Sequence, residues 1–370
     1  MDKPSDKTDT QAKPTWEIPL EDPEKLRVDK PATWAGGIPA ISTTLKHTTK
    51  EMGLIRGGQA LLKVNQKLGF DCPGCGWPDP DGERAITEFC ENGAKAVAHE
   101  ATKKVITEAF FQQWSLEELG QQSDYWLGQQ GRLTRPMKKD AEGTHYRPIS
   151  WEEAFDTLAR HLNALDDPNE AIFYTSGRTS NEAAFLYQLF ARLYGTNNLP
   201  DSSNMCHESS SVGMKEVIGI GKATVTLDDF DHVDAIFILG QNPGTNHPRM
   251  LAMLQKAARR GCQIVSINPL PEAGTTRFIH PQEVTHWLSK GTPLATLFLP
   301  VKINGDVPLL KGIMKELLER EEQYPGTVLD RPFIQNYTEG FERFAATLQT
   351  FSWDEIIEGS GITRSEIQQA

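Results

Sequence analysis

Apolar residues in the second half of the chain follow helical spacing just after residue 150. The positions on one face of this stretch are Ala154, Phe155, Leu158, Leu162 and Leu165. The run Ser150-Trp-Glu-Glu153 before them has the sequence of a capping box, in which a serine and a glutamate close the first helical turn. The pattern therefore predicts an amphipathic helix that begins after Ser150 and runs to about Leu165.

Short apolar runs alternate with further helical stretches beyond this point. We expect strands over 171–174, 232–239 and 263–267, and helices over 181–194 and 247–260. Each of these two helices is followed by a glycine, which is the usual residue just past a helix end. Buried strands separated by helices are typical of a parallel sheet with right-handed crossovers. The sequence thus predicts an α/β fold with a parallel-sheet domain of the nucleotide-binding type.

The chain before residue 149 lacks this alternation. Residues 1–65 are expected to be a polar arm and a glycine-rich lead-in, and residues 66–148 a small domain that holds three of the five cysteines. Residues 149–370 are the α/β region. No apolar stretch approaches the roughly 20 residues that a membrane helix needs, and the polar start has no apolar segment like that of a secretory signal. We expect a cytoplasmic protein with no membrane span.

Charge and cysteine content narrow the possible partners. The formal net charge of −12 argues against nucleic acid as a partner, because phosphate binding depends on clustered Lys and Arg. Five cysteines in 370 residues do not make a disulfide scaffold. In a reducing compartment, a closely spaced cysteine pair more often binds metal or carries out redox chemistry.

The last residues have the pattern of a helix start close to the end of the chain. Thr363-Arg-Ser-Glu366 has the sequence of a capping box, yet the chain stops at Ala370, about one helical turn later. A helix this short is marginal unless it is packed. We expect that the chain is cut from a longer protein; the alternative is a short terminal helix.

Two thiols close together form the first candidate site. Cys72-Pro-Gly-Cys75 places them on one tight turn, a geometry that serves zinc, an iron–sulfur cluster or a dithiol redox pair. Cys90 is a third candidate ligand. Cys262 opens an apparently buried strand and is expected to be a small core residue.

Cys206 and His207 form the second candidate site, in a polar run from 201 to 211 that we expect to be a loop. A loop thiolate can ligate a soft metal or attack an electrophile. A histidine beside it can exchange protons near neutral pH. The alternative is a solvent-exposed thiol next to a histidine that caps a helix.

Two loops after predicted strands are candidate ligand-binding segments. Gly240-Gln-Asn242-Pro-Gly244 follows one strand and precedes a helix, at the edge where open α/β sheets bind nucleotides. Asn268 ends the next strand. The G-x-G-x-x-G pattern of dinucleotide sites is absent there. The loop that contains Ser176, Arg178 and Asn181 is similarly placed after the 171–174 run, although it could be an ordinary helix start.

In the order of these motifs the chain resembles the molybdopterin oxidoreductases, and within them the formate dehydrogenase alpha-subunit-like branch. The resemblance covers about residues 65–370. Besides the cysteine region, the motifs that carry it are Arg132–Pro136, Trp151–Phe155, Ser176–Glu182, Phe190–Asn198, Cys206-His207, Gly240–Pro243 and His247-Pro248.

The resemblance implies a metal cofactor, Mo-bis(molybdopterin guanine dinucleotide). Cys206 would be the thiolate ligand of molybdenum or tungsten, and His207 would handle the proton. Gly240, Asn242 and Asn268 would lie along a guanine dinucleotide, in an α/β region that is incomplete. The loop with Ser176, Arg178 and Asn181 would also bind the cofactor.

The resemblance further implies that residues 66–148 form an iron–sulfur-type domain. Cys72, Cys75 and Cys90 would hold a [4Fe–4S] cluster. The family usually has four cluster cysteines, with the third one four residues after the second. Here that position is Asp79, so the cluster has an unusual ligand, or is altered or absent.

The function implied is that of a formate dehydrogenase-like enzyme. It would carry out two-electron redox chemistry on a small-molecule substrate, and the cluster would relay electrons to an acceptor or a redox partner protein. Two alternatives come from other classes. One is a zinc- or cluster-stabilised α/β binding protein without turnover, and the other is a dithiol redox protein that uses Cys72 and Cys75.

Overall fold

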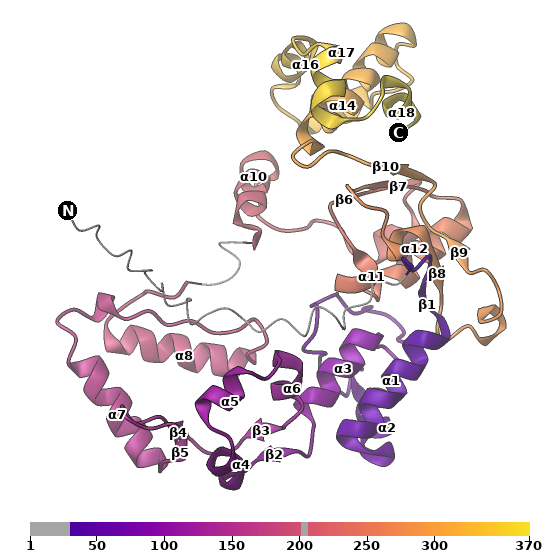
Figure 1. Ribbon diagram of the computed structural model, residues 1–370. Coiled ribbons are helices and arrows are strands. Elements are labelled where there is room, and N and C mark those ends of the chain that lie inside the picture. Colours follow the sequence, from indigo (N-terminus) through magenta and orange to yellow (C-terminus); the bar gives the residue numbers. More distant parts are fainter. Residues whose placement is uncertain (1–29, 201–205) are drawn as a thin grey trace, which may run out of the picture. The chain divides into compact units, whose positions relative to one another are not determined.

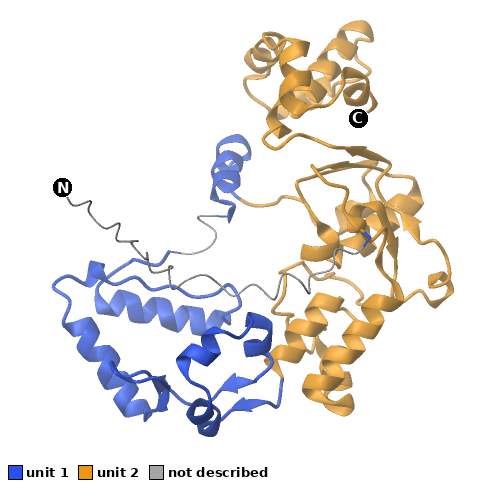
Figure 2. Ribbon diagram, in the orientation of Figure 1, with its two compact units in different colours: residues 1–30, 102–221 blue, residues 31–101, 222–370 orange. Residues whose placement is uncertain are grey.

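The computed structural model describes residues 30–200 and 206–370, which divide into two compact units (Figure 2). Of this described part, unit 1 contains residue 30 and residues 102–200 and 206–221, and unit 2 contains residues 31–101 and 222–370. The chain is a mixed α/β protein with small parallel sheets (Figure 1). Unit 2 is built from two segments that lie far apart in the sequence, and unit 1 is rich in short helices and strands.

The main sheet of unit 2 is parallel, as the apolar pattern predicts. Its strands are β6 (Ala235–Leu239), β7 (Gln263–Ile267) and β10 (Leu297–Leu299), in the order β10-β7-β6. Helix α12 (Met250–Arg260) connects β6 to β7 and ends at Gly261, which adopts the left-handed conformation. Leu251 and Leu254 of α12 pack with Ile264 of β7 in one buried cluster. Cys262 lies in the same cluster with 4% exposure, which confirms that it is a core residue.

Residues 35–63 are more ordered than a lead-in. Strand β1 (Ala35–Gly36) pairs in parallel with β8 (Arg277–Ile279), which pairs with β9 (Thr292–Pro293). Helices α1 (Gly37–Met52) and α2 (Leu54–Lys63) pack on α3 (Glu91–Glu100). The buried side chains of Met52, Val64 and Val97 hold these helices together. The arm expected over residues 1–29 lies outside the described residues.

Adjacent glycines in α2 give a matched test of this helix packing. A Cβ on Gly57 would lie 2.5 Å from Thr48 Cγ2 on α1, whereas a Cβ on Gly58 would meet nothing within 4 Å. Gly58→Ala is therefore expected to stabilise the protein by about 0.5–1 kcal/mol, because alanine is the better helix former. Gly57→Ala is expected to destabilise it by about 1–3 kcal/mol through overpacking. Urea denaturation checks both, and equal effects at the two positions would contradict this packing.

Five helices follow β10 in the C-terminal part of unit 2. They are α14 (Asp306–Gln323), α15 (Arg331–Tyr337), α16 (Phe341–Gln349), α17 (Trp353–Ser360) and α18 (Arg364–Gln369). Leu309, Ile356 and Ile367 of α14, α17 and α18 share a buried cluster with Ile267 and Leu299 of the sheet. Thr363 and Glu366 form the capping box that the sequence predicts, at the start of α18.

Glu321, near the end of α14, holds the segment that follows this helix. Its carboxylate accepts hydrogen bonds from the backbone N–H groups of Gly326, Val328 and Leu329 at 3.0–3.1 Å and from Arg331 Nε at 3.2 Å. These bonds, first of all the one from Gly326, lower the pKa of Glu321 to about 2. The anionic form is therefore favoured in the folded protein.

The lowered pKa of Glu321 predicts a pH-dependent contribution to stability. The ordinary pKa of a glutamate is 4.5, so the contribution is fully present above that pH and is lost as the pH falls toward 2. Glu321→Gln is expected to lower the urea midpoint at pH 7, and the difference from wild type is expected to shrink below pH 4.5. A difference that stays constant down to acid pH would show that the charge plays no part.

Unit 1 consists of short strands and helices. Its strand pairs are β2 (Val105–Ile106) with β3 (Arg132–Leu133), and β4 (Met137–Lys138) with β5 (Arg147–Pro148). Its helices are α4 (Glu108–Gln113), α5 (Leu116–Gly120), α6 (Asp124–Gly128), α7 (Trp151–Asn163), α8 (Asn181–Tyr194) and α10 (Glu208–Ile218). Helices α7 and α8 begin where the sequence predicts, and Gly195 ends α8 in the left-handed conformation.

Two local expectations in unit 1 are wrong. Ala171–Tyr174 is not a strand, although Phe173 donates a backbone hydrogen bond to Asn198 O at 2.9 Å. This segment is buried at alternate residues by α8, but in the described part of the chain no strand pairs with it. At the start of α7, Ser150 accepts from the Glu153 N–H, whereas the Glu153 side chain pairs with Arg147 at 3.0 Å. The capping box is therefore only half formed.

The unit boundaries differ from the division at residues 65 and 148 that the sequence suggests. Residues 66–101 belong to unit 2 with the main sheet, and residues 102–148 belong to unit 1. The reason is physical: α3 packs on α1 and α2, while the segments after Ala101 pair among themselves. Among the described residues, no helix is both long and apolar enough to cross a membrane.

Candidate cofactor and metal sites

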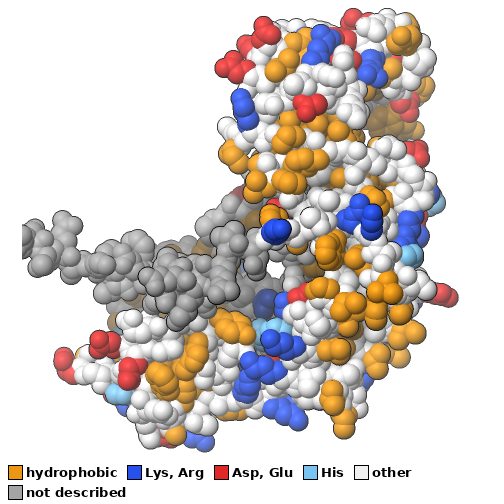
Figure 3. Space-filling view, turned by 45° about the vertical axis from the view of Figure 1, so that its right-hand side comes forward, with side chains coloured by type: hydrophobic (Ala, Val, Ile, Leu, Met, Phe, Trp, Pro, Cys, Tyr) orange, Lys and Arg blue, Asp and Glu red, His pale blue; other side chains and the backbone are white. Residues whose placement is uncertain are grey.

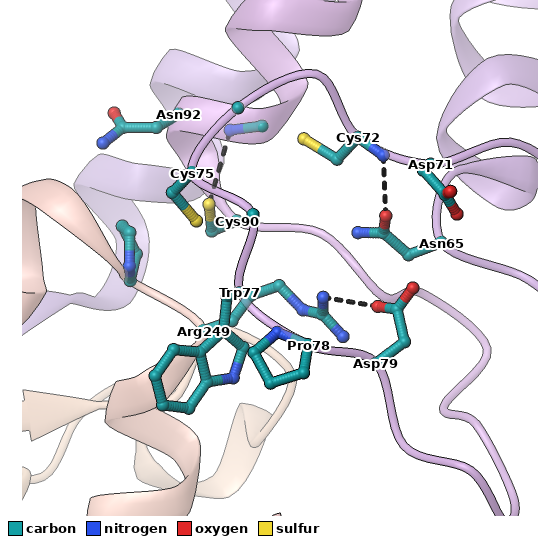
Figure 4. A pocket seen from close by; sticks show the side chains of 14 residues that line it. Asn65, Asp71, Cys72, Cys75, Trp77, Pro78, Asp79, Cys90, Asn92 and Arg249 are labelled. Carbon is teal, nitrogen blue, oxygen red and sulfur yellow. Dashed lines mark hydrogen bonds and ion pairs between the residues drawn. The ribbon is translucent and has the colours of Figure 1, made fainter. Parts of the chain in front are cut away.

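Three cysteines of unit 2 line one cavity of about 260 Å³ (Figure 4). Cys72 and Cys75 come from the loop after α2, and Cys90 is the residue that caps the N-terminus of α3. Cys90 Sγ accepts a hydrogen bond from the Gly93 N–H at 3.3 Å, and the Cys72 N–H donates to Asn65 Oδ1 at 2.8 Å. The structure thus brings together the three thiols that the sequence proposes as ligands. We call this cavity the cysteine pocket.

Two glycines keep space beside these sulfurs. A Cβ on Gly93 would lie 2.9 Å from Cys72 Sγ and 3.7 Å from Cys90 Sγ, and a Cβ on Gly74 would lie 3.2 Å from Cys72 Sγ. A side chain at either position would therefore press on the thiols. The cysteine pocket is shaped by the absence of these side chains.

The thiol of Cys90 is held in its protonated form. Burial raises its pKa, and the nearby Cys75 and Cys72 raise it further, while the hydrogen bond from Gly93 acts in the opposite direction. Three thiolates gathered in one pocket need a positive charge to compensate them. A bound metal centre supplies such a charge and deprotonates its thiol ligands.

Asp79 lines the cysteine pocket, and its carboxylate faces Arg249 (Figure 4). Its Oδ1 is 2.6 Å from Arg249 Nη1 and its Oδ2 is 3.3 Å from Arg84 Nη1. Arg249 also pairs with Glu88 at 2.8 Å, and Arg84 donates to the backbone oxygen of Asn65. All four charged side chains are at most 18% exposed. They form a partly buried network that fixes Asp79 away from the sulfurs.

Three thiols are donors of the kind that zinc and iron–sulfur clusters take. In the described part of the chain, no group of three or more His, Cys, Asp or Glu side chains is arranged to hold a metal ion. A structural zinc site needs four ligands at about 2.0–2.3 Å from one centre. An iron–sulfur cluster instead spreads its thiolate ligands over several irons. Three of the four cysteines of such a site are present, and the fourth is not.

The loop after β6 meets the loop after β7 at the carboxyl edge of the main sheet. Gly240 has φ +62°, a conformation that favours glycine, and its N–H donates to Ile267 O at 2.9 Å. Asn242 caps α11 (Pro243–Asn246), and its amide donates to Glu272 Oε2 at 2.8 Å. Asn268 donates to Leu270 O at 2.8 Å. The three predicted residues therefore lie at one edge, where the side-chain amides of Asn242 and Asn268 hold the loops.

Close packing of two glycines fixes this edge. A Cβ on Gly274, in α13 (Ala273–Thr276), would lie 2.5 Å from the backbone of Gly244 in α11. Asn92, beside the cysteine pocket, donates to Thr245 O at 2.6 Å. The cysteine pocket and the sheet edge are thus joined by a direct hydrogen bond within unit 2.

Sequence reasoning missed several residues around these two sites. Arg249 and Glu88 were not expected, nor was Glu272, the partner of Asn242. A weak signal exists for Arg249, which directly follows the His247-Pro248 motif, and for Glu272, which follows the end of β7 closely. Arg249 also lines a second, mostly apolar cavity of about 540 Å³ in unit 2.

Large apolar side chains are exposed on α1 and α2, and one of them, Leu45, lines this second cavity. Large ones on α1 and α2 include Leu45, Leu54, Ile55 and Leu62, and hydrophobic side chains are frequent on the face drawn in Figure 3. Apolar area of this kind is typical of surfaces that contact another polypeptide or a ligand.

The remaining candidate residues belong to unit 1. Ser176 and Arg178 lie on an exposed loop, where Ser176 Oγ accepts from the Arg178 N–H at 3.2 Å. Asn181 is the first residue of α8, whose N-cap is Ser180. This geometry is that of a helix start with an exposed polar loop before it, and a role in cofactor binding stays a prediction.

Cys206 and His207 lie at the start of α10 and are both exposed. His207 is the N-cap residue, and its side chain makes no capping hydrogen bond. Residues 201–205 of the same polar run lie outside the described residues. The position matches an exposed thiol beside a capping histidine, and it leaves both side chains accessible to a ligand. Their roles as metal ligand and proton carrier stay predictions.

Comparison with known proteins identifies relatives over most of the chain. An uncharacterised oxidoreductase of Mycobacterium tuberculosis is 50% identical over 335 residues, which are 90% of this chain and 43% of that protein. Protein YdeP of Escherichia coli is 44% identical over 350 residues, 93% of this chain and 46% of its own length. Formate dehydrogenase H of Escherichia coli is 27% identical over 244 residues, 65% of this chain and 31% of that enzyme. The chain spans less than half the length of these relatives.

A solved structure and a family model also match parts of the chain. Acetylene hydratase from Pelobacter acetylenicus aligns with 64% of this chain and 30% of its own, with a TM-score of 0.50 and 19% sequence identity, which shows a shared fold. The family model for molybdopterin oxidoreductases matches residues 132–282, a range that includes Cys206, Gly240 and Asn268. Residues 132–282 therefore match a molybdopterin oxidoreductase domain, as the motifs indicate, and the chain is similar to formate dehydrogenase H over part of its length.

Proposed function

We propose that the protein is an enzyme, a molybdopterin oxidoreductase of the formate dehydrogenase-like kind. The observation that carries this proposal is the match of the family model over residues 132–282, which contain the Cys206-His207 pair and both sheet-edge loops. The chain spans less than half the length of its relatives. The activity proposed for the whole protein is therefore argued from this domain and from the candidate sites. The thiols of the cysteine pocket favour a reducing compartment such as the cytoplasm.

Each candidate residue has a distinct part in the proposed enzyme. The cofactor, Mo-bis(molybdopterin guanine dinucleotide), supplies a metal that takes up or releases two electrons when bound. The loops at Gly240, Asn242 and Asn268 offer backbone groups to its nucleotide part, at the sheet edge where such ligands bind. The exposed loop with Ser176, Arg178 and Asn181 offers a cation and hydroxyl groups to phosphate.

The residues nearest the proposed chemistry are at the start of α10. Cys206 would hold the metal through its thiolate, a ligand that suits soft metals. His207 would hold and move a proton at its imidazole, because histidine is the side chain that most often acts as a general acid or base. Cys72, Cys75 and Cys90 would hold an iron–sulfur cluster that passes electrons to an acceptor or a redox partner protein.

Substitution of the cysteine-pocket thiols tests the cluster. Cys72→Ser, Cys75→Ser and Cys90→Ser are each expected to bleach iron–sulfur absorbance in anaerobically purified protein, because each removes one ligand. Cys262→Ala is the matched control, since Cys262 is buried in the sheet core and should leave the absorbance unchanged. Wild-type protein with stoichiometric zinc and no iron would contradict the cluster.

Formate-driven dye reduction tests the proposed activity. Intact protein under anaerobic conditions is expected to transfer electrons from formate to an artificial acceptor such as a viologen. If the acceptor is reduced with a different small substrate but not with formate, the protein is an oxidoreductase and the proposed likeness in substrate to formate dehydrogenases is wrong. Fully loaded protein that reduces no acceptor with any substrate tried would favour a binding protein without turnover.

A further inference from the structure

We infer that the cysteine pocket holds its iron–sulfur cluster through three thiolates only, and that Asp79 is not the missing fourth ligand. The inference rests on the proposed function for the presence of a cluster. It goes beyond that function by assigning the ligands and by giving Asp79 a structural part. One iron of a four-iron cluster would then have no cysteine ligand and would be exchangeable.

Asp79 stands where the family has its third cluster cysteine, and a carboxylate is able to bind iron. Both of its oxygens are already engaged, however. Oδ1 lies 2.6 Å from Arg249 Nη1, and Oδ2 lies 3.3 Å from Arg84 Nη1. The carboxylate is thus held by a cation on each side, and these two contacts fix the direction in which it points.

The positions of the two arginines make this arrangement hard to exchange for iron ligation. Arg249 is tied to Glu88 at 2.8 Å, and its side chain is only 13% exposed. Arg84 is anchored by the backbone oxygens of Asn65 and, at 3.2 Å, of Pro80. If Asp79 turned toward the sulfurs, Arg249 and Arg84 would each lose a charged partner while partly shielded from water. Removal of one partner from a shielded ion pair is strongly unfavourable.

The Arg249–Asp79 ion pair connects two parts of unit 2. Arg249 links the start of α12, beside the sheet edge, to the loop that carries Cys72 and Cys75. The Arg249–Asp79 pair joins residues 170 positions apart in the sequence. Asp79 therefore serves to hold the cysteine loop onto the main sheet, and the three thiols are left as the ligands.

A three-thiolate cluster behaves differently from a four-thiolate one under mild oxidation. An oxidised four-iron cluster, with charge 2+, loses the iron that lacks a cysteine ligand as Fe²⁺ and gives one electron to ferricyanide. The product is a three-iron cluster with charge 1+, so charge and atoms balance. This product is paramagnetic, whereas the oxidised four-iron cluster is diamagnetic.

The test compares wild type with Asp79→Asn, which removes the carboxylate but keeps an amide oxygen that still accepts a hydrogen bond from Arg249, so the loop stays attached. Intact protein is purified anaerobically, treated with a slight excess of ferricyanide and desalted; iron is counted and the electron paramagnetic resonance spectrum recorded. Both proteins are expected to keep about three irons per chain, and both should show the signal of an oxidised three-iron cluster. Addition of Fe²⁺ with dithionite should restore about four irons per chain.

Three results would overturn the inference. Retention of about four irons and a silent spectrum in wild type, with about three irons in Asp79→Asn, would make Asp79 a ligand. Four irons in both proteins would place a fourth ligand elsewhere. No iron in wild type would mean that the pocket holds no cluster. Molybdenum and pterin, measured on the same samples, separate this last failure from a failure of the proposed function.

Discussion

Cys206→Ser is expected to abolish turnover while the protein stays folded. A serine hydroxyl is a poor replacement for a thiolate on a soft metal. The thiol is exposed at the start of α10, so it contributes little packing. Activity with formate and a viologen, measured beside a thermal unfolding curve, separates the two effects.

The control for this substitution is Cys262→Ala. It removes a different thiol, one that lies in the sheet core with 4% exposure. It should lower stability modestly and leave turnover per folded protein unchanged. Undiminished activity in Cys206→Ser would remove Cys206 from the metal site.

His207→Ala is expected to slow the chemical step by roughly 10²–10⁴-fold, the usual worth of a positioned acid–base group. Metal content should stay near that of wild type, because the proposed ligand is Cys206. The imidazole makes no capping hydrogen bond to α10, so its removal should not weaken the helix start. Single-turnover reduction of the metal by substrate measures the step directly.

His161→Ala provides the comparison for His207→Ala. His161 is an exposed histidine of α7 in the same unit, and its loss should leave the rate unchanged. A wild-type rate in His207→Ala would reduce His207 to a neighbour of the site. Loss of metal from that variant would make it a ligand or a support of the ligand instead.

Elements whose signals are local could be predicted from the sequence. Strand β7 is largely apolar, and α8 is bounded by a serine cap and by Gly195 in the left-handed conformation. The boundaries of such elements depend on residues within or next to them. The parallel order of β6 and β7 follows from the helix between them, because such a connection returns the chain in the same direction.

Elements that depend on distant partners could not be predicted in the same way. Ala171–Tyr174 has strand composition, but strand formation needs a pairing segment, and composition does not reveal one. The helical nature of residues 37–63 was hidden by glycines and threonines, which are weak helix formers. Burial of Met52 and Gly57 against neighbouring helices overrides that weakness.

The candidate sites show the same division. The three cysteines of the pocket could be named from their residue type and spacing, and the structure places them around one cavity. The Arg249–Asp79 pair could not, because it joins residues far apart in the chain and depends on how α12 meets the cysteine loop. The sequence shows that position 79 holds an aspartate instead of a cysteine. Only the fold shows that the carboxylate of Asp79 pairs with two arginines.

Metal and pterin analysis of the intact, purified protein tests the proposed function most directly. The account predicts molybdenum or tungsten in an amount close to that of the protein, together with iron and with guanine nucleotide released from the cofactor. Folded protein with no molybdenum, tungsten or pterin would contradict it. In that case, stoichiometric zinc would indicate a binding protein, and a reversible disulfide between Cys72 and Cys75 in metal-free protein would indicate a dithiol redox protein.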